Sequence, residues 1–152
     1  MPTIRRAGVE DLEQIVALRM AMLREMRPEA PVSDAEVEEL TRRYLAEKLP
    51  AGEFLVWFAE EEGRVVGTSG LVFSHRPPTL TCTSELHAYV LNMYTLPEWR
   101  GRGVATMLLE HMIEYVKTTP ARRIALHATE MGRPIYERLR FVPSDAYMVL
   151  AV

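Results

Sequence analysis

The chain has 152 residues, of which 48% are hydrophobic and 26% charged, a balance typical of a soluble globular protein. A net charge of −3 argues against a nucleic-acid partner, and the single cysteine, Cys82, excludes an internal disulfide and any metal site built from several cysteines. Apolar runs such as Leu55 to Ala59 are far too short to cross a bilayer, and charged residues interrupt the N-terminal segment, so we expect one cytoplasmic domain, residues 1–152, with no membrane partner and no metal.

The N-terminal third predicts one strand and two helices. Thr3 to Arg6 reads as a short strand, and the acidic pair Glu10-Asp11 stands where a helix N-terminus favours negative charge. An apolar stripe at helical spacing follows and ends at Pro28. Ser33 and Glu36 have the spacing of a capping box, so a second helix should begin there and end at Pro50.

Two strands, Glu53 to Glu60 and Arg64 to Ser74, should form a hairpin through a short acidic connection. Both faces of the first strand are apolar, which is typical of a sheet covered on both sides. Gly67 and Gly70 interrupt the second strand, so we expect a bulge or a close backbone approach there. The next residues, His75 to Thr83, either wall a substrate cleft or form a long connector.

The most informative segment follows the long strand Glu85 to Thr95. Pro97 ends the strand, Arg100-Gly101-Arg102-Gly103 forms a loop, and the apolar spacing from Val104 predicts a helix to about Thr118. This order leaves unpaired backbone N–H groups at a helix N-terminus, where the helix dipole adds partial positive charge. Such a site suits a phosphate group.

This loop differs from the two common nucleotide-binding loops. A Walker A loop needs a lysine after its last glycine, and the dinucleotide fingerprint needs a third glycine where this chain has Thr106. The alternative interpretation is that the loop binds no ligand. Its glycines would then serve only a tight turn, and its arginines only the protein surface.

The C-terminal part predicts a strand from Arg122 to His127, a helix that begins at Gly132-Arg133-Pro134, and a final strand from Tyr147 to Val152. The order of elements is therefore β-α-α-β-β-β-α-β-α-β. It predicts one mixed sheet with helices packed on it and parallel pairing around the two later helices.

Two motifs and this order of elements resemble the GNAT N-acetyltransferase family. Arg100, Gly103 and Ala105 match its acetyl-CoA signature, Arg/Gln-x-x-Gly-x-Gly/Ala, and the segment from Ile135 to Phe141 is close to its Tyr-Glu-x-Leu-Gly-Phe motif. The resemblance implies an α/β (α+β) fold, with a mixed, mostly antiparallel central sheet of about six or seven strands flanked by about four helices.

Two positions depart from the family pattern. Arg140 stands where glycine usually ends the helix with a positive φ, so the departure implies strain or a different helix exit. Thr129-Glu130 lies near a position where many members carry an asparagine that contacts the cofactor.

The resemblance also implies a cofactor site for acetyl-CoA as co-substrate. The pyrophosphate would lie on the loop amides, two arginines would add charge, and the end of the strand would pair through its main chain with the pantetheine arm. A bulge near Asn92 to Tyr94 would separate this strand from Arg122 to His127 and open the cleft, and a backbone N–H there would stabilise the oxyanion. The implied cofactor-binding residues are Met93, Tyr94, Thr95, Arg100, Gly101, Arg102, Gly103, Val104, Ala105 and Thr106.

Within the implied reaction, Tyr136 is the candidate general acid that donates a proton to the departing CoA thiolate, although a core tyrosine on an amphipathic helix would show the same spacing. The general base stays open, because a water chain can replace a side chain. The four candidates for it, chosen for their place near the expected cleft, are His87, His127, Glu85 and Glu130.

The implied activity is direct transfer of an acetyl group to a primary amine of an unidentified small molecule or peptide. A non-catalytic acyl-CoA-binding or sensor domain on the same fold is the alternative. The acidic residues of the second helix either attract a cationic amine or simply form a solvated face. A homodimer is possible on base rates, and the sequence adds nothing decisive.

Overall fold

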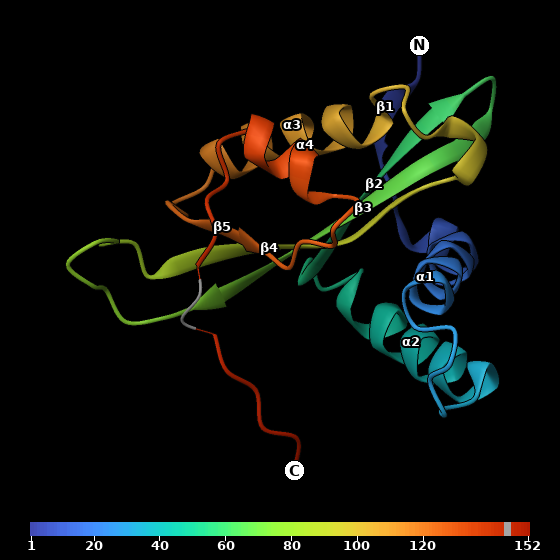
Figure 1. Ribbon diagram of the computed structural model, residues 1–152, viewed down its shortest axis with the longest axis horizontal. Coiled ribbons are helices and arrows are strands. Elements are labelled where there is room, and N and C mark those ends of the chain that lie inside the picture. The colour runs from blue at the N-terminus through green and yellow to red at the C-terminus, as the bar shows by residue number, and fades with distance from the viewer. Residues whose placement is uncertain (145–146) are drawn as a thin grey trace.

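The computed structural model describes residues 1–144 and 147–152, and it shows a five-stranded sheet between two layers of helices (Figure 1). Helices α1 and α2 cover one face, and α3 and α4 cover the other (Figure 1). The strands are β1 (Thr3–Arg6), β2 (Phe54–Glu61), β3 (Arg64–His75), β4 (Leu86–Thr95) and β5 (Ile124–Leu126).

The helices begin and end close to the predicted signals. Ser33 caps α2, since its hydroxyl accepts from the Glu36 N–H at 3.2 Å, and α1 ends just before Pro28. None of the helices in the described parts of the chain is both long and apolar enough to span a bilayer. The helices are α1 (Leu12–Met26), α2 (Asp34–Lys48), α3 (Val104–Lys117) and α4 (Arg133–Arg138), with 3-10 turns η1 (Val9–Asp11) and η2 (Pro97–Trp99).

The sheet has the order β1-β2-β3-β4-β5, with three antiparallel pairings and one parallel pairing. This confirms the mixed, mostly antiparallel GNAT-like sheet and the parallel pair around α3, but the sheet has five strands, fewer than predicted. The predicted strand from Tyr147 to Val152 is absent, so the second parallel pair, around α4, is absent too. A strand needs a neighbouring strand as hydrogen-bond partner. The edge strand β5 has only three residues, and the residues from Tyr147 to Val152 are exposed.

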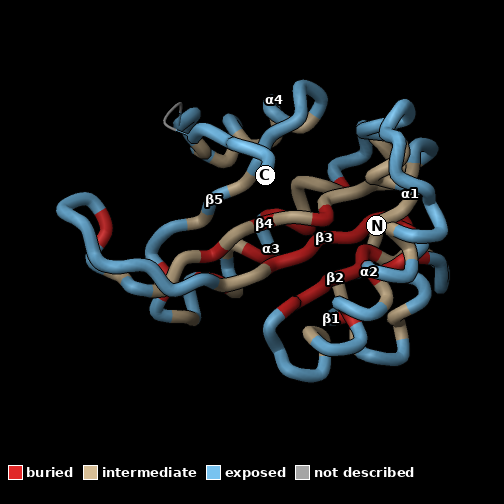
Figure 2. Tube along the Cα trace, turned by 90° about the horizontal axis from the view of Figure 1, so that it is seen from below, coloured by how far each residue is buried: buried red, intermediate tan, exposed pale blue. Residues whose placement is uncertain are grey.

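Strand β2 divides the core into two parts. Residues Phe54 to Ala59 are all buried, and alternate side chains point to opposite faces of the sheet. Phe54, Val56 and Phe58 join the cluster under α1 and α2, and Leu55, Trp57 and Ala59 join the cluster under α3. The buried centre and exposed outer helix surfaces are visible in Figure 2, and they confirm a sheet covered on both faces.

The glycines of β3 permit the close approaches that the sequence predicted. A Cβ at Gly67 would lie 2.7 Å from Cγ1 of Val104, so the absence of a side chain lets α3 approach the sheet. A Cβ at Gly70 would lie 3.0 Å from the Phe54 ring and 3.1 Å from Cβ of Asn92. Strands β2, β3 and β4 therefore hold α3 and the Asn92 region at fixed positions.

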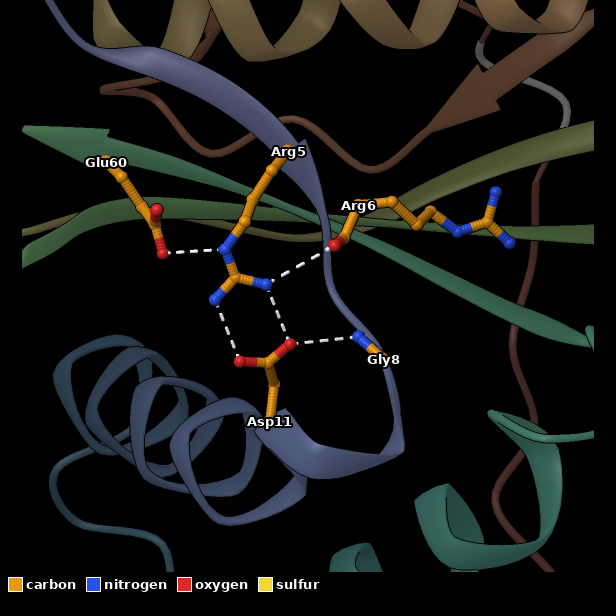
Figure 3. A network of polar contacts seen from close by, with 5 residues as sticks. All are labelled: Arg5, Arg6, Gly8, Asp11 and Glu60. Carbon is orange, nitrogen blue, oxygen red and sulfur yellow. Dashed lines mark hydrogen bonds and ion pairs between the residues drawn. The ribbon is translucent and has the colours of Figure 1, made fainter. Parts of the chain in front are cut away.

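An ion-pair network fastens the start of α1 to the sheet (Figure 3). Arg5 on β1 donates two hydrogen bonds of 2.8 Å to the Asp11 carboxylate and one of 2.7 Å to Glu60 on β2. Asp11 also accepts from the Gly8 N–H at 2.9 Å. These bonds lower the pKa of Asp11 below its usual value, chiefly through Arg5. The network fixes the direction in which α1 leaves β1.

Candidate active site

A bulge in β4 separates this strand from β5. Asn92 has φ +57°, and two residues of β4, Asn92 and Met93, stand where β3 has Ser69 alone. Strand β5 pairs only with Ala88 to Val90, so the two strands diverge after that point. The bulge and the separation of the strands were both expected from the resemblance.

The loop after β4 presents free backbone donors at the start of α3. Gly101 and Gly103 have φ of +74° and +81°, a conformation that favours glycine. Open space surrounds both positions, so the requirement for glycine is conformational and not steric. Within the described residues, the N–H groups from Gly101 to Thr106 have no backbone acceptor, and no side chain caps α3. These amides can therefore hold an anion.

A cavity of about 430 Å³ connects this loop with the end of β4, α1 and α4. Nine of the ten predicted cofactor-binding residues line it, and Arg102 does not. Thr129 also lines it, and its hydroxyl accepts from the Gly132 N–H at 3.1 Å. The nine residues are Met93, Tyr94, Thr95, Arg100, Gly101, Gly103, Val104, Ala105 and Thr106.

The two arginines of the loop have other contacts. Arg100 pairs with Glu25 of α1 at 2.8 Å and donates to the Thr95 carbonyl at 3.1 Å, so it holds the loop against α1 and β4. Glu25 raises the pKa of Arg100, and Arg100 lowers the pKa of Glu25. Arg102 lies over the Trp99 ring, 4.9 Å from its centroid. The backbone amides are therefore the least engaged donors of the loop.

Tyr136 lies in α4 on the opposite wall of the same cavity. Its ring packs edge-on against Phe141, at 6.1 Å between centroids, and covers Gly132, where a Cβ would lie 2.9 Å from the ring. Its hydroxyl makes no hydrogen bond to another described residue, and burial raises the pKa of the phenol. The hydroxyl therefore stays protonated and is available as a donor.

Comparisons with known proteins identify the family. The model of the acetyltransferase (GNAT) family matches residues 14–141. The chain belongs to the GNAT acetyltransferase family. The comparison with curated proteins found no match.

Solved structures agree with this assignment of the GNAT chain. A predicted acetyltransferase from Clostridium acetobutylicum, solved with acetyl-CoA, is 30% identical with a TM-score of 0.90, and the match covers 99% of this chain and 96% of that one. A GCN5-related N-acetyltransferase from Ralstonia eutropha JMP134 is 28% identical with a TM-score of 0.91, covering 100% and 99%. Glucosamine-6-phosphate N-acetyltransferase from Arabidopsis thaliana is 16% identical with a TM-score of 0.71, covering 99% and 98%, and shares the fold alone. GNAT enzymes are acetyltransferases, and this chain is one of them.

None of the four predicted base candidates of this GNAT enzyme lines the cavity. His87 is directed to the Ser84 carbonyl, at 3.2 Å, and lies near Cys82. His127 contacts the Tyr89 hydroxyl beyond the end of β5. Glu85 and Glu130 are exposed, although Glu130 stands between two lining residues. Their role as bases stays a prediction.

The structure adds one carboxylate to the cavity that sequence reasoning missed, and it gives the Tyr94 side chain a partner. Glu25 lines the cavity, and the Tyr94 hydroxyl donates to it at 3.3 Å. Burial raises the pKa of Tyr94, and the neighbouring Glu25 adds to this effect. Tyr94 and Arg100 lie 69 and 75 positions from Glu25 in the chain, so no local pattern indicates these contacts.

Proposed function

We propose that this GNAT enzyme binds acetyl-CoA in the cavity along β4 and transfers the acetyl group to a primary amine. One observation carries the proposal: a single cavity joins the free amides of residues 101–106 to Tyr136 past the bulge in β4. The presence of acetyl-CoA in the structure of the Clostridium relative supports the same cofactor here.

In the proposed complex the loop amides hold the pyrophosphate, and the polar main chain of Met93 to Thr95 lies beside the pantetheine arm. The cofactor would then point its thioester at the bulge and at Tyr136. Nothing in this arrangement needs the side chains of Arg100 or Arg102, which have protein contacts of their own.

The proposed reaction is a direct transfer. The amine nitrogen attacks the thioester carbonyl carbon, and a backbone N–H beside the bulge stabilises the resulting oxyanion. The C–S bond then breaks and the Tyr136 hydroxyl donates its proton to the sulfur. The amine proton passes to water, and water returns a proton to the Tyr136 phenolate. The products are an N-acetylated amine and free CoA thiol.

Thermal unfolding with acetyl-CoA, beside ATP and NAD controls, tests the cofactor. At 100 times its dissociation constant the ligand should stabilise the fold by about 2.7 kcal/mol, or roughly 5–10 °C in the midpoint. Ala105→Glu places a carboxylate among the loop amides and should abolish the shift, whereas Ala46→Glu on the exposed side of α2 should keep it. Equal shifts with ATP or NAD would contradict an acetyl-CoA site.

Release of free thiol from acetyl-CoA with a panel of primary amines tests the transfer step. A shift with acetyl-CoA but no release of thiol with any amine would support the non-catalytic acyl-CoA-binding alternative. Release that depends on the added amine supports the transferase.

A further inference from the structure

A second cavity, of about 360 Å³, lies between α1, α2 and the sheet, on the other side of the β4 bulge from the cofactor loop. Its walls are mainly apolar, and one cation, Arg19 of α1, enters it. The lining residues that matter here are Leu40, Tyr44, Phe54 and Leu91. A volume of this size accommodates an amino-acid-sized group.

Arg19 has no carboxylate partner among the described residues, unlike two other arginines of α1 and α2. No carboxylate within the described parts of the chain lies within 4.0 Å of its guanidinium, and its hydrogen bond goes to Oδ1 of Asn92, at 3.3 Å from Nη1. By contrast, Arg24 on the same helix pairs with Asp34, and Arg42 of α2 pairs with three glutamates. Arg19 is half-buried, so its charge is only partly hydrated.

The surroundings of Arg19 are short of acceptors. Burial lowers the pKa of its guanidinium, because the pocket is a poor solvent for an unpaired cation. Beside it, the side-chain nitrogen Nδ2 of Asn92 is buried and has no acceptor among the described residues. Asn92 lines neither cavity, so Arg19 is the group that an anion entering the second cavity would pair with.

The second cavity adjoins the cofactor cavity along two elements. On α1, Arg19 lines the second cavity and Met22, three residues later, lines the cofactor cavity, so the two side chains lie on one side of the helix. On β4, Leu91 lines the second cavity and Met93 lines the cofactor cavity, with Asn92 between them. A small molecule anchored at Arg19 therefore lies next to the bulge.

We propose that the second cavity is the acceptor site, and that the acceptor is a primary amine that carries a carboxylate and an apolar body, such as an apolar α-amino acid. The carboxylate binds the Arg19 guanidinium, the apolar body packs against Leu40, Phe54 and Leu91, and the amine is directed to the bulge. The inference rests on the proposed function, since it takes the bulge as the position of the thioester.

The charges of α2 agree with an anionic acceptor. Of the acidic residues that would attract a cationic amine, Glu36, Glu39 and Glu47 are exposed and Glu38 is half-buried. Glu38 and Glu39 already pair with Arg42. Among residues 1–144 and 147–152, no carboxylate lines the cavity. The one charged side chain that enters it is therefore positive.

The test compares acceptors that share the leucine side chain, with and without the carboxylate, and one amine that carries a phosphate but no apolar body. L-Leucine, L-leucinamide, isopentylamine and O-phosphoethanolamine are assayed by thiol release with wild type, Arg19→Met and Arg19→Lys. Arg43→Met is the matched control, because Arg43 is exposed on α2 and has no ion pair in the described residues. Thermal unfolding with L-leucine, and separately with acetyl-CoA, measures binding at the two cavities without turnover.

We expect kcat/KM for L-leucine to exceed that for the amide and the simple amine by about 10- to 100-fold, the range of a hydrogen-bonded charge pair. Arg19→Met should remove this preference and the unfolding shift with L-leucine, while the shift with acetyl-CoA stays. Arg19→Lys should restore part of the preference and part of the L-leucine shift. Arg43→Met should change neither the preference nor the L-leucine shift. Equal use of amide and acid, insensitivity to Arg19→Met, or a preference for O-phosphoethanolamine would overturn the inference.

The two readouts separate this inference from the proposed function. A leucine shift that depends on Arg19, without any thiol release, supports the anion site and counts against the transferase. Thiol release that is independent of Arg19 supports the transferase and counts against the anion site.

Discussion

Replacing Tyr136 by phenylalanine removes the proposed proton donor and little else. The ring is held by Phe141 and by its contact with Gly132, and the hydroxyl has no hydrogen-bond partner within the described residues. The ring of the variant should therefore keep its position. We expect the free energy of unfolding to change by no more than about 0.5 kcal/mol.

The effect on turnover should be much larger. General acid catalysis contributes about 10²- to 10⁴-fold, and water can partly replace the tyrosine, so we expect kcat to fall by about 100-fold, or about 2.7 kcal/mol in the barrier. Because burial raises the pKa of Tyr136 above its usual value near 10, the wild-type hydroxyl stays protonated from pH 7 to 9.5. The variant should therefore be slower over that whole range.

The assay is steady-state release of free thiol with the best acceptor of the amine panel, with acetyl-CoA varied at several pH values. Tyr115→Phe is the matched control, because Tyr115 is a half-buried tyrosine that packs on Trp57 away from the cavity. Wild-type kcat in Tyr136→Phe across pH 7 to 9.5, or a change confined to the KM for acetyl-CoA, would refute the role of Tyr136 as general acid.

Two further predictions concern stability. Arg140 has φ +68° at the end of α4 and is exposed. Arg140→Gly should therefore relieve strain and stabilise the fold by about 1 kcal/mol, a rise of roughly 2–4 °C in Tm by calorimetry. An unchanged or lower Tm would contradict this. Asp11→Asn should cost about 1–2 kcal/mol at pH 7 by urea unfolding, because Arg5 loses a charged partner. The pKa of Asp11 is lowered on folding, so this contribution is present above pH 4 and is lost as pH falls through the folded-state pKa; a difference of the same size at pH 2 and pH 7 would count against the ion pair.

The elements that depend on local chemistry were predictable from the sequence. Ser33 caps α2 because its hydroxyl and the Glu36 amide are neighbours in the chain. Arg140 adopts the positive φ of a glycine position, so of the two predicted alternatives, strain or a different helix exit, the structure shows the strained conformation. The loop glycines adopt positive φ, which brings unpaired amides to the start of α3. Each of these features is decided within a few residues.

Features that need a distant partner were not predictable in the same way. The segment from Tyr147 to Val152 has the composition of a strand, but pairing requires an edge, and β5 is only three residues long. The ion pair between Arg100 and Glu25 joins residues 75 positions apart. Arg19 did leave a signal, because it occupies a position in the apolar stripe of α1, between Ile15 and Met22, where a charge is out of place.

Asn92 lies between Leu91, which lines the second cavity, and Met93, which lines the first. Its left-handed conformation, costly for a residue other than glycine, lies in the bulge where β4 diverges from β5, next to the cavity that we propose for acetyl-CoA. The same residue accepts from Arg19 and leaves its own amide nitrogen unsatisfied beside the second cavity. A straight strand would instead extend the pairing with β5 and remove the gap between the two strands. Strain and an unpaired donor at one buried position are understandable if acetyl transfer takes place across it.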